Sequence, residues 1–296
     1  MQAASGRTVA ILITTYRRNA KLLRLVEMMT ALIRAYAGPN HYFICVADSD
    51  RTNDVALPPG TSYLVNAGDG FDDNLLGAFR FLSGACDHVF AMADDDLPNP
   101  FVDPLTIIDA ALRCDERDVV LFNHVTYVES GGITLDRHFY SVTETVNLSA
   151  DPIPMLSGRM PRYAGVLYRT AFVRALLPQL QALRTSLHAY AAPIYIAADR
   201  GRFLFFDHGI VLFDDAAKAD GAWESARRVH RGLMQFLKHM APCLSPGAYR
   251  YLVQGLYHVF FRVNRKSVWR TDLPGVPDFA TLELFEAHLA TLDDGA

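Results

Sequence analysis

The sequence predicts an α/β protein with a mostly parallel sheet flanked by helices and a helical extension at the C-terminus. Short apolar runs typical of buried strands alternate with amphipathic segments of helical period as far as residue 128. Such alternation favours parallel strands with helices packed on both faces of the sheet. Three further helical segments follow residue 215, with no strand-like run between them.

The elements of the first half follow in a regular order. Strands are predicted at residues 8–16, 41–50, 62–68, 88–96 and 118–128, and helices at 19–38, 72–85 and 99–114. In the first helix apolar residues recur at helical spacing, and Gly38-Pro39 ends it. Asp72 or Asp73 begins the second helix, where acids suit the positive end of the helix dipole.

The second half has a less regular pattern. Residues 131–148 alternate weakly and predict hairpin-like strands, and the Pro- and Gly-containing segment 149–165 predicts a mobile loop. Helices are predicted at 169–183 and 187–201, two short strands within 202–213, and C-terminal helices at 220–240, 245–266 and 277–292. We therefore predict a domain of residues 1–215, with halves 1–125 and 126–215, and a helical region of residues 216–296.

Composition excludes several classes of protein. The formal net charge of −4 gives no basic field for nucleic acid, and no apolar run approaches the roughly 20 residues that span a bilayer. The N-terminus lacks the basic segment and long apolar run of a signal peptide. The four cysteines are not paired at metal-ligand spacing, so we expect free thiols and a cytoplasmic location.

Polar residues gather where four predicted strands end. These clusters are Thr14-Thr15-Tyr16, Asp48-Ser49-Asp50, Asn66 with Gly68, and Asp94-Asp95-Asp96. The carboxyl ends of parallel strands meet at one edge of a sheet, and ligands of such sheets bind there. The sequence therefore predicts a ligand site at this edge.

The three consecutive aspartates indicate the chemistry of that site. With no basic partner beside them in sequence, they favour a hard divalent cation, Mg²⁺ or Mn²⁺, which binds carboxylates and completes its shell with phosphate oxygens and water. The structural alternatives are a cap for the helix after Pro98 and a solvated turn. No G-x-G-x-x-G follows the first strand and no G-x-x-x-x-G-K-[ST] occurs anywhere, which argues against a dinucleotide site and a P-loop.

Four segments follow one another within residues 8–125: ILITTYRRNAKLLRLV, FICVADSD, VNAGDGFDDNLLGAFRF and FAMADDDLPNP. In this order they resemble the motifs of family 2 glycosyltransferases of the GT-A, Rossmann-like fold, of the bacterial surface-polysaccharide type. The resemblance makes residues 1–125 the nucleotide-sugar half and 126–215 the acceptor half.

The resemblance also assigns roles to the strand ends. It implies that Thr14, Thr15 and Tyr16 line the nucleotide pocket, and that Asp48, or alternatively Asp50, contacts the base. It places Asp94 at the ribose or the metal, Asp96 at the metal, and leaves Asp95 as a further nucleotide-sugar residue. Arg17 could neutralise phosphate or be an exposed turn residue, and Asn74 could face the donor or the helix surface.

The resemblance implies an inverting reaction in which an acceptor hydroxyl attacks the sugar and a general base takes its proton. Family members commonly carry an acidic pair for this purpose, and the chain has none at that place. The base position falls near His188, whose side chain has a pKa near neutrality; the alternatives are Asp199, Asp207, His208 and Asp151.

The expected partners are a UDP-, GDP-, CDP- or dTDP-linked sugar and a glycan or lipid-linked acceptor. An aromatic stripe from Tyr249 to Phe261, followed by basic residues, is a candidate for peripheral contact with the inner face of the membrane, and packing on the main domain is the alternative. Two other functions stay open: a catalytically inactive nucleotide-sugar-binding module, and a nucleotidyltransferase.

Overall fold

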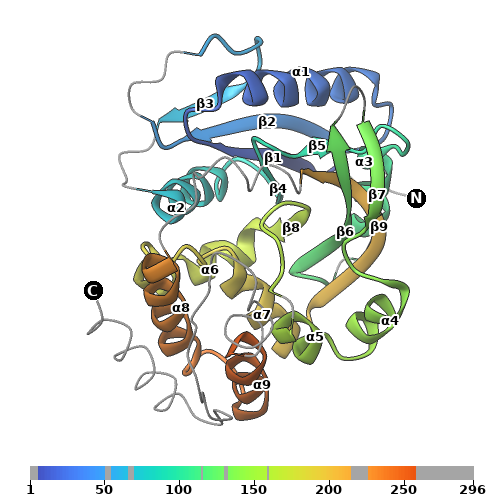
Figure 1. Cartoon of the computed structure of the whole chain (residues 1–296). Helices are drawn as coiled ribbons and strands as arrows, with labels where there is room; N and C mark the ends of the chain where they lie inside the picture. Colours follow the sequence, from blue (N-terminus) through green and yellow to red (C-terminus); the bar gives the residue numbers. More distant parts are fainter. Residues whose placement is uncertain are drawn as a thin grey trace.

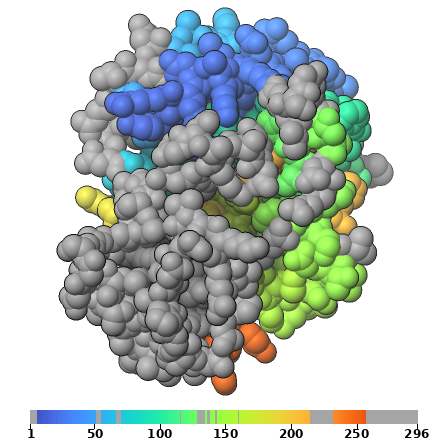
Figure 2. Space-filling model, in the orientation of Figure 1, coloured from blue at the N-terminus to red at the C-terminus, as the bar shows by residue number. Residues whose placement is uncertain are grey.

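A computed structural model describes residues 6–50, 55–65, 70–114, 116–129, 133–158, 160–214 and 226–257. Within these residues a nine-stranded, mostly parallel sheet is flanked by helices (Figure 1). This confirms the predicted α/β fold class. In the space-filling view the N-terminal half forms the upper part of the molecule, and residues of β6, β7 and α4 line one side (Figure 2).

The first half contains β1 (Thr8–Thr15), α1 (Asn19–Ala35), β2 (His41–Asp48), β3 (Ser62–Val65), α2 (Phe71–Leu82), β4 (His88–Ala93), β5 (Leu97–Pro98) and α3 (Pro104–Leu112). The second half contains β6 (Val119–Glu129), β7 (Ile133–His138), α4 (Val142–Ala150), α5 (Pro152–Gly158), β8 (Val166–Arg169), α6 (Thr170–Leu180), a 3₁₀ turn (Gln181–Leu183), α7 (Ala191–Asp199) and β9 (Phe203–Asp214). Two helices follow, α8 (Ala226–Met240) and α9 (Pro246–Tyr257).

The strand order is β3-β2-β1-β4-β8-β6-β9-β5, and β7 pairs with β6. The strands β3, β2, β1 and β4 run parallel, whereas β8 is antiparallel to both β4 and β6. The carboxyl ends of β1, β2 and β4 therefore lie side by side.

The central strand β1 shows why this order is stable. Its side chains alternate between the two faces of the sheet. Ala10 and Leu12 pack in the core that contains α2, α6 and α7, while Val9, Ile11 and Ile13 pack in the core that contains α1 and α3. Because both faces are covered, residues 9–13 of β1 are apolar at every position.

Three regions differ from the sequence prediction. The segment 131–148 holds one strand, β7, followed by the helix α4, which begins at a capping box of Ser141 and Glu144. The predicted loop 149–165 contains the short helix α5, and the two strands predicted within 202–213 are replaced by the single strand β9 (Phe203–Asp214). β9 bulges between Phe206 and Val211 opposite β6, which explains the apparent break into two strands.

The C-terminal helices pack against the second half of the chain, since α9 lies on α5 and α8 on the 3₁₀ turn. In the aromatic stripe, Leu252, Val253 and Leu256 are buried in the core, so this part of the stripe is packing surface. Residues beyond Tyr257, including the basic cluster and the third predicted helix, lie outside the described residues. Among the described residues, no helix has the length and apolar character to span a membrane.

Candidate active site

The register of the sheet assembles the predicted site. Thr15 of β1 pairs with Asp48 of β2, and Thr14 pairs with Ala93 of β4, directly before the aspartates. The backbone N–H of Asp94 donates to the carbonyl of Thr14 at 3.2 Å. Residues separated by up to 80 positions in sequence thus meet at one sheet edge, as the sequence predicts.

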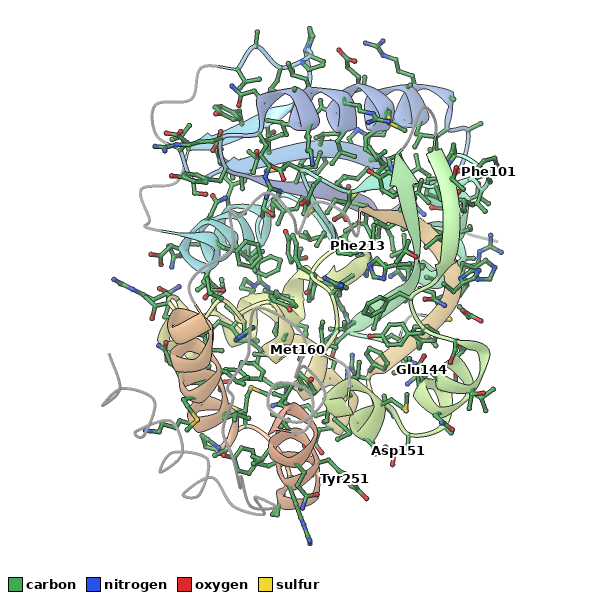
Figure 3. The ribbon with its side chains drawn as sticks, viewed as in Figure 1. Phe101, Glu144, Asp151, Met160, Phe213 and Tyr251 are labelled. Atoms are coloured by element: carbon green, nitrogen blue, oxygen red, sulfur yellow. The ribbon has the colours of Figure 1, made fainter. Side chains whose placement is uncertain are left out.

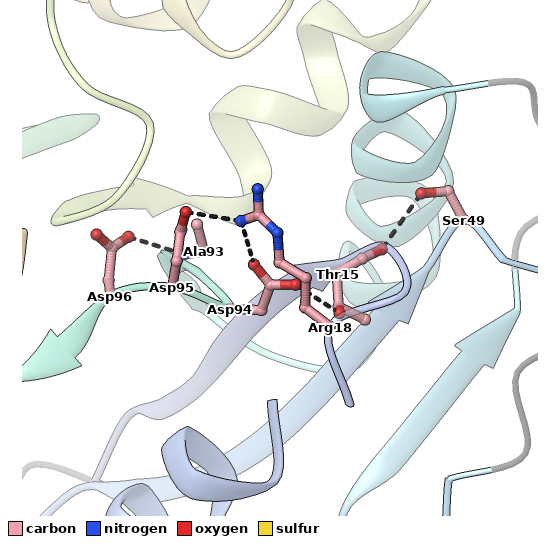
Figure 4. Close-up of polar contacts among 7 residues, drawn as sticks. All are labelled: Thr15, Arg18, Ser49, Ala93, Asp94, Asp95 and Asp96. Atoms are coloured by element: carbon pink, nitrogen blue, oxygen red, sulfur yellow. Dashed lines mark hydrogen bonds and ion pairs between the residues drawn. The ribbon is translucent and has the colours of Figure 1, made fainter. Parts of the chain in front are cut away.

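Asp94 is held by β1. The hydroxyl of Thr15 donates a hydrogen bond to Asp94 Oδ2 at 2.7 Å, and both side chains are buried (Figure 4). Burial raises the pKa of Asp94 to about 6, against the opposing effects of the Thr15 hydrogen bond and of Arg18. The ordering of Asp94 before any ligand arrives is a form of preorganisation.

Arg18 is the basic partner that the local sequence does not reveal. Its Nη1 lies 2.7 Å from Asp95 Oδ2 and 3.2 Å from Asp94 Oδ1 (Figure 4). Arg18 precedes α1, and the acids follow β4, so only the fold brings them together. The aspartates have no basic neighbour in sequence, but the fold supplies one, and the three acids still outnumber this single arginine.

Asp96 turns back toward the strand. Its Oδ2 accepts a hydrogen bond from the backbone N–H of Ala93 at 3.1 Å, and the residue is 2% exposed. Burial raises the pKa of Asp96 well above its ordinary value, and repulsion from the charge of Asp95 adds a smaller effect in the same direction. A cation beside this carboxylate would oppose both effects and favour the ionised form.

The acids fit a divalent cation of the kind that phosphates help to bind. Among the described residues, no three His, Cys, Asp or Glu side chains converge on one point to form a complete cage. Magnesium and manganese sites in phosphate chemistry usually take one or two carboxylates and complete their shell with substrate phosphates and water. The carboxylates of Asp94 and Asp96 are hard oxygen groups of this type, while Arg18 contacts Asp95 and, at a longer distance, Asp94.

A second group lies at the ends of β1 and β2. Asp48 accepts hydrogen bonds from the backbone N–H of Asp50 and from the hydroxyl of Tyr63, both at 2.8 Å. Arg17 pairs with Asp50 at 2.7 Å and adopts a left-handed φ of 57°, which is unusual for a residue other than glycine. Local strain of this kind clusters at functional sites.

Tyr16 and Asn74, two further residues that the sequence predicts for the nucleotide pocket, differ in their exposure. Tyr16 is 53% exposed and lies against the Arg17 guanidinium, 4.9 Å from ring centroid to carbon. Asn74 is buried and donates to the carbonyl of Ala47 at 2.7 Å, which ties α2 to β2. Asn66 and Gly68 lie outside the described residues.

His188 does not join this group. Its ring is buried against Phe236 of α8, with ring centroids 6.0 Å apart, and neither ring nitrogen has a hydrogen-bond partner among the described residues. Burial lowers the pKa of His188 to about 4. Because a general base must reach the proton it takes, this burial argues against the predicted role.

The alternative bases have structural contacts. Asp199 accepts hydrogen bonds from the backbone and hydroxyl of Ser245, and so ties α7 to α9. Asp207 accepts from the Asn123 amide, and His208 lies against the Phe206 ring, both within the bulge of β9. Asp151 is exposed at the end of α4.

Sequence reasoning missed the role of Asp72. Its carboxylate accepts hydrogen bonds from the backbone N–H groups of Leu187 and Ala189 and from the hydroxyl of Ser186. Burial raises the pKa of Asp72 to about 7, despite these bonds. Asp72 therefore fixes the turn before α7, in which Leu187 has a left-handed φ of 65°. The only sequence signal was its place in the first turn of a helix.

Similarity to known proteins is found in structure and not in sequence. No protein-family model and no curated protein matches the sequence. The structure of S. aureus TarS superposes with a TM-score of 0.56 and 15% sequence identity over 87% of this chain, which spans 44% of that TarS chain.

Two further structures match. TarS 1–349 in complex with UDP gives a TM-score of 0.54 at 15% identity and covers 91% of this chain and 76% of that one. Glucosyl-3-phosphoglycerate synthase from Mycobacterium tuberculosis, in complex with Mn²⁺, UDP and glucosyl-3-phosphoglycerate, is a looser match, with a TM-score of 0.49 at 14% identity over 82% of each chain. At such identity the likeness to TarS shows the fold alone, and that fold is the GT-A fold of glycosyltransferases, as the sequence predicts.

Proposed function

We propose that the chain is a metal-dependent glycosyltransferase that moves a sugar from a nucleotide diphosphate-sugar to a hydroxyl of a glycan or lipid-linked acceptor. The observation that carries the proposal is the hydrogen bond from Thr15 to the buried Asp94, with Asp96 beside it, at the carboxyl edge of a GT-A sheet. Surface polysaccharide or glycoconjugate assembly is the pathway that the family resemblance favours.

In this proposal Asp94 and Asp96 hold Mn²⁺ or Mg²⁺. The bound cation would supply positive charge to the departing nucleoside diphosphate. Thr15 orients Asp94, and burial of Asp96 strengthens its electrostatic interactions. Tyr16, Arg17, Asp48 and Asp50 would line the nucleotide pocket, where the acids can accept hydrogen bonds from base or ribose.

We propose attack on the anomeric carbon with inversion of configuration, at the inner face of the membrane if the acceptor is lipid-linked. His188 is the base that the sequence predicts, and it would have to leave the core to act.

A thermal-shift panel tests the nucleotide site. UDP is the first ligand to try, because TarS was crystallised with it, followed by GDP, CDP and dTDP, each with and without Mn²⁺. Ligands that bind the native state raise the melting temperature. We expect one nucleotide to give a shift that requires Mn²⁺, disappears in Asp96→Asn and persists in Glu27→Gln, a matched change at an exposed acid of α1. A panel with no shift would overturn the proposal.

Donor hydrolysis separates the alternatives. An active transferase slowly releases nucleoside diphosphate from its sugar nucleotide in the presence of Mn²⁺, whereas an inactive binding module shows the thermal shift without release. A nucleotidyltransferase would instead form a sugar nucleotide from a sugar phosphate and a nucleoside triphosphate, with release of pyrophosphate.

A further inference from the structure

Arg162 lies near the acid cluster without belonging to any segment that resembles the family. It lies between α5 and β8 in sequence. Its positive charge lowers the pKa of Asp96 and of Tyr190, against the larger effect of burial, which raises both. Arg162 is half-buried, and it comes from the second half of the chain. Arg162 therefore brings a positive charge from the second half of the chain to the neighbourhood of Asp96.

Two aromatic rings hold the Arg162 side chain. Its guanidinium carbon lies 3.9 Å from the ring centroid of Phe213 in β9 and 5.0 Å from that of Phe139, which follows β7. Phe213 lies in the middle of the molecule, between the β1–β4 half and the C-terminal helices (Figure 3). Contact with rings both attracts the cation and restricts its movement.

The backbone around Arg162 is fixed on both sides. The Pro161 carbonyl accepts a hydrogen bond from the Tyr190 hydroxyl at 3.1 Å, and the Ala164 carbonyl lies 2.6 Å from Nε2 of the buried His124. The N–H of Gly165 donates to the Ala91 carbonyl of β4 at 2.9 Å. The loop is thus attached to the strand that carries the aspartates, so the position of Arg162 relative to them is set by the fold.

Aromatic contact and oxyanion binding use different parts of arginine. Rings contact the face of the planar guanidinium, whereas phosphate or carboxylate oxygens are bound through N–H groups in its plane. One guanidinium can therefore make both interactions. A cation held by the aspartates would also attract an oxyanion bound near the acidic cluster.

We propose that Arg162 is an oxyanion-binding residue of the site and that the group it binds is of the phosphate class. The inference rests on the proposed function and extends it to the second half of the chain. The oxyanion has two possible sources, the donor diphosphate and an anionic group on the acceptor, and the experiment distinguishes them.

The test measures binding by calorimetry with the whole chain. The variants are Arg162→Gln, which removes the charge, Arg162→Lys, which keeps the charge but loses the planar fork, and Arg34→Gln, a matched change at an exposed residue of α1. The probes are UDP and pyrophosphate, each with Mn²⁺, and inorganic phosphate with and without saturating UDP and Mn²⁺. If Arg162→Gln lowers the melting temperature below the assay temperature, Arg162→Lys serves in its place.

Binding to the donor diphosphate predicts that Arg162→Gln weakens UDP and pyrophosphate by about tenfold or more, with partial recovery in Arg162→Lys. Binding to the acceptor predicts unchanged UDP affinity and loss of the phosphate site on the UDP-loaded protein. Arg34→Gln should match wild type in both arms.

Unchanged binding of every probe in Arg162→Gln would overturn the inference, and so would a wild-type protein that binds neither pyrophosphate nor phosphate. If the nucleotide proposal alone fails, wild type binds no UDP but still binds pyrophosphate or phosphate in a manner that depends on Arg162.

Discussion

Arg18 forms an ion pair with Asp95, 2.7 Å from nitrogen to oxygen, and the same nitrogen lies 3.2 Å from Asp94. The guanidinium thus neutralises part of the acid cluster before any metal is bound. A metal that binds Asp94 would have to share that carboxylate with Arg18 or displace it.

We expect Arg18→Gln to bind Mn²⁺ more tightly in the absence of nucleotide. Removing a nearby, partly exposed positive charge removes a repulsion worth on the order of 1 kcal/mol, or about fivefold in affinity. Electron paramagnetic resonance of free Mn²⁺ measures this directly, with Arg34→Gln as control. Weaker metal binding in Arg18→Gln would mean that Arg18 orders the aspartates rather than competing at them.

Asp72 should contribute to stability through the turn before α7. Asp72→Ala leaves the buried N–H groups of Leu187 and Ala189 without their acceptor, and each such loss costs about 1–3 kcal/mol. Asp72→Asn keeps one carbonyl oxygen and should cost less. Urea denaturation measures both changes, and a neutral Asp72→Ala would show that the turn does not depend on this side chain.

The same residue makes stability depend on pH. Because burial raises the pKa of Asp72 to about 7 in the folded state, the folded protein binds this proton more tightly than the unfolded chain, where the pKa is about 4. Stability from this group is therefore greatest at low pH and falls as pH rises from about 4 to 7.

Asparagine does not titrate, so Asp72→Asn should lack this pH dependence. We therefore expect wild type to lose stability relative to the variant between about pH 5 and 8. Denaturation at the two pH values checks the expectation, and a constant difference would contradict it.

His188→Leu distinguishes a core residue from a base. Because the ring packs on Phe236 without a polar partner in the described part of the chain, we expect the variant to keep nucleotide binding and to retain turnover within about tenfold of wild type. Loss of a general base would instead cost about a hundredfold or more. Such a loss at an unchanged melting temperature, with a flattened pH profile, would restore the sequence assignment.

The sequence predicts the N-terminal half of the fold well because its signals are local. Each signal lies within a short stretch of sequence: the apolar run of β1, the helical period of α1 and the acids after β4. Because the carboxyl ends of parallel strands meet at one edge of the sheet, these separate signals predict one site. That rule also explains why Thr15 and Asp94 could be placed in one site from sequence.

Contacts between distant residues could not be predicted in this way. Arg18 meets Asp95 across 77 positions, and Asp72 meets Leu187 across 115. Arg162 reaches its aromatic contacts only after β7 and β9 are placed on either side of β6.

Short or ambiguous elements were also missed, each for a physical reason. The strands β5 and β8 have two and four residues, too few to show a period. In α4 the β-branched residues favour a strand, which is why the sequence predicts strands there. The capping box of Ser141 and Glu144, which favours the start of a helix, was the better guide to the structure.

A pair of glycines in α9 tests whether this helix is part of the folded unit. A Cβ on Gly255 would lie 2.5 Å from backbone atoms of Ser157 in α5, whereas a Cβ on Gly247 would meet no atom within 4 Å. In an unobstructed helix, alanine is favoured over glycine by about 0.5–1 kcal/mol. The two positions should therefore respond to the same substitution with opposite signs.

We expect Gly247→Ala to be neutral or stabilising and Gly255→Ala to destabilise by about 1–3 kcal/mol, because α9 must move away from α5 to admit the methyl group. Urea denaturation of the whole chain, followed by far-UV circular dichroism, provides both values. If both variants are stabilised, α9 does not pack against α5 in solution, and the helical region of residues 216–296 is not part of the same cooperative unit. If the signs differ as expected, removal of α9 would expose the buried face of α5 and destabilise the second half of the chain.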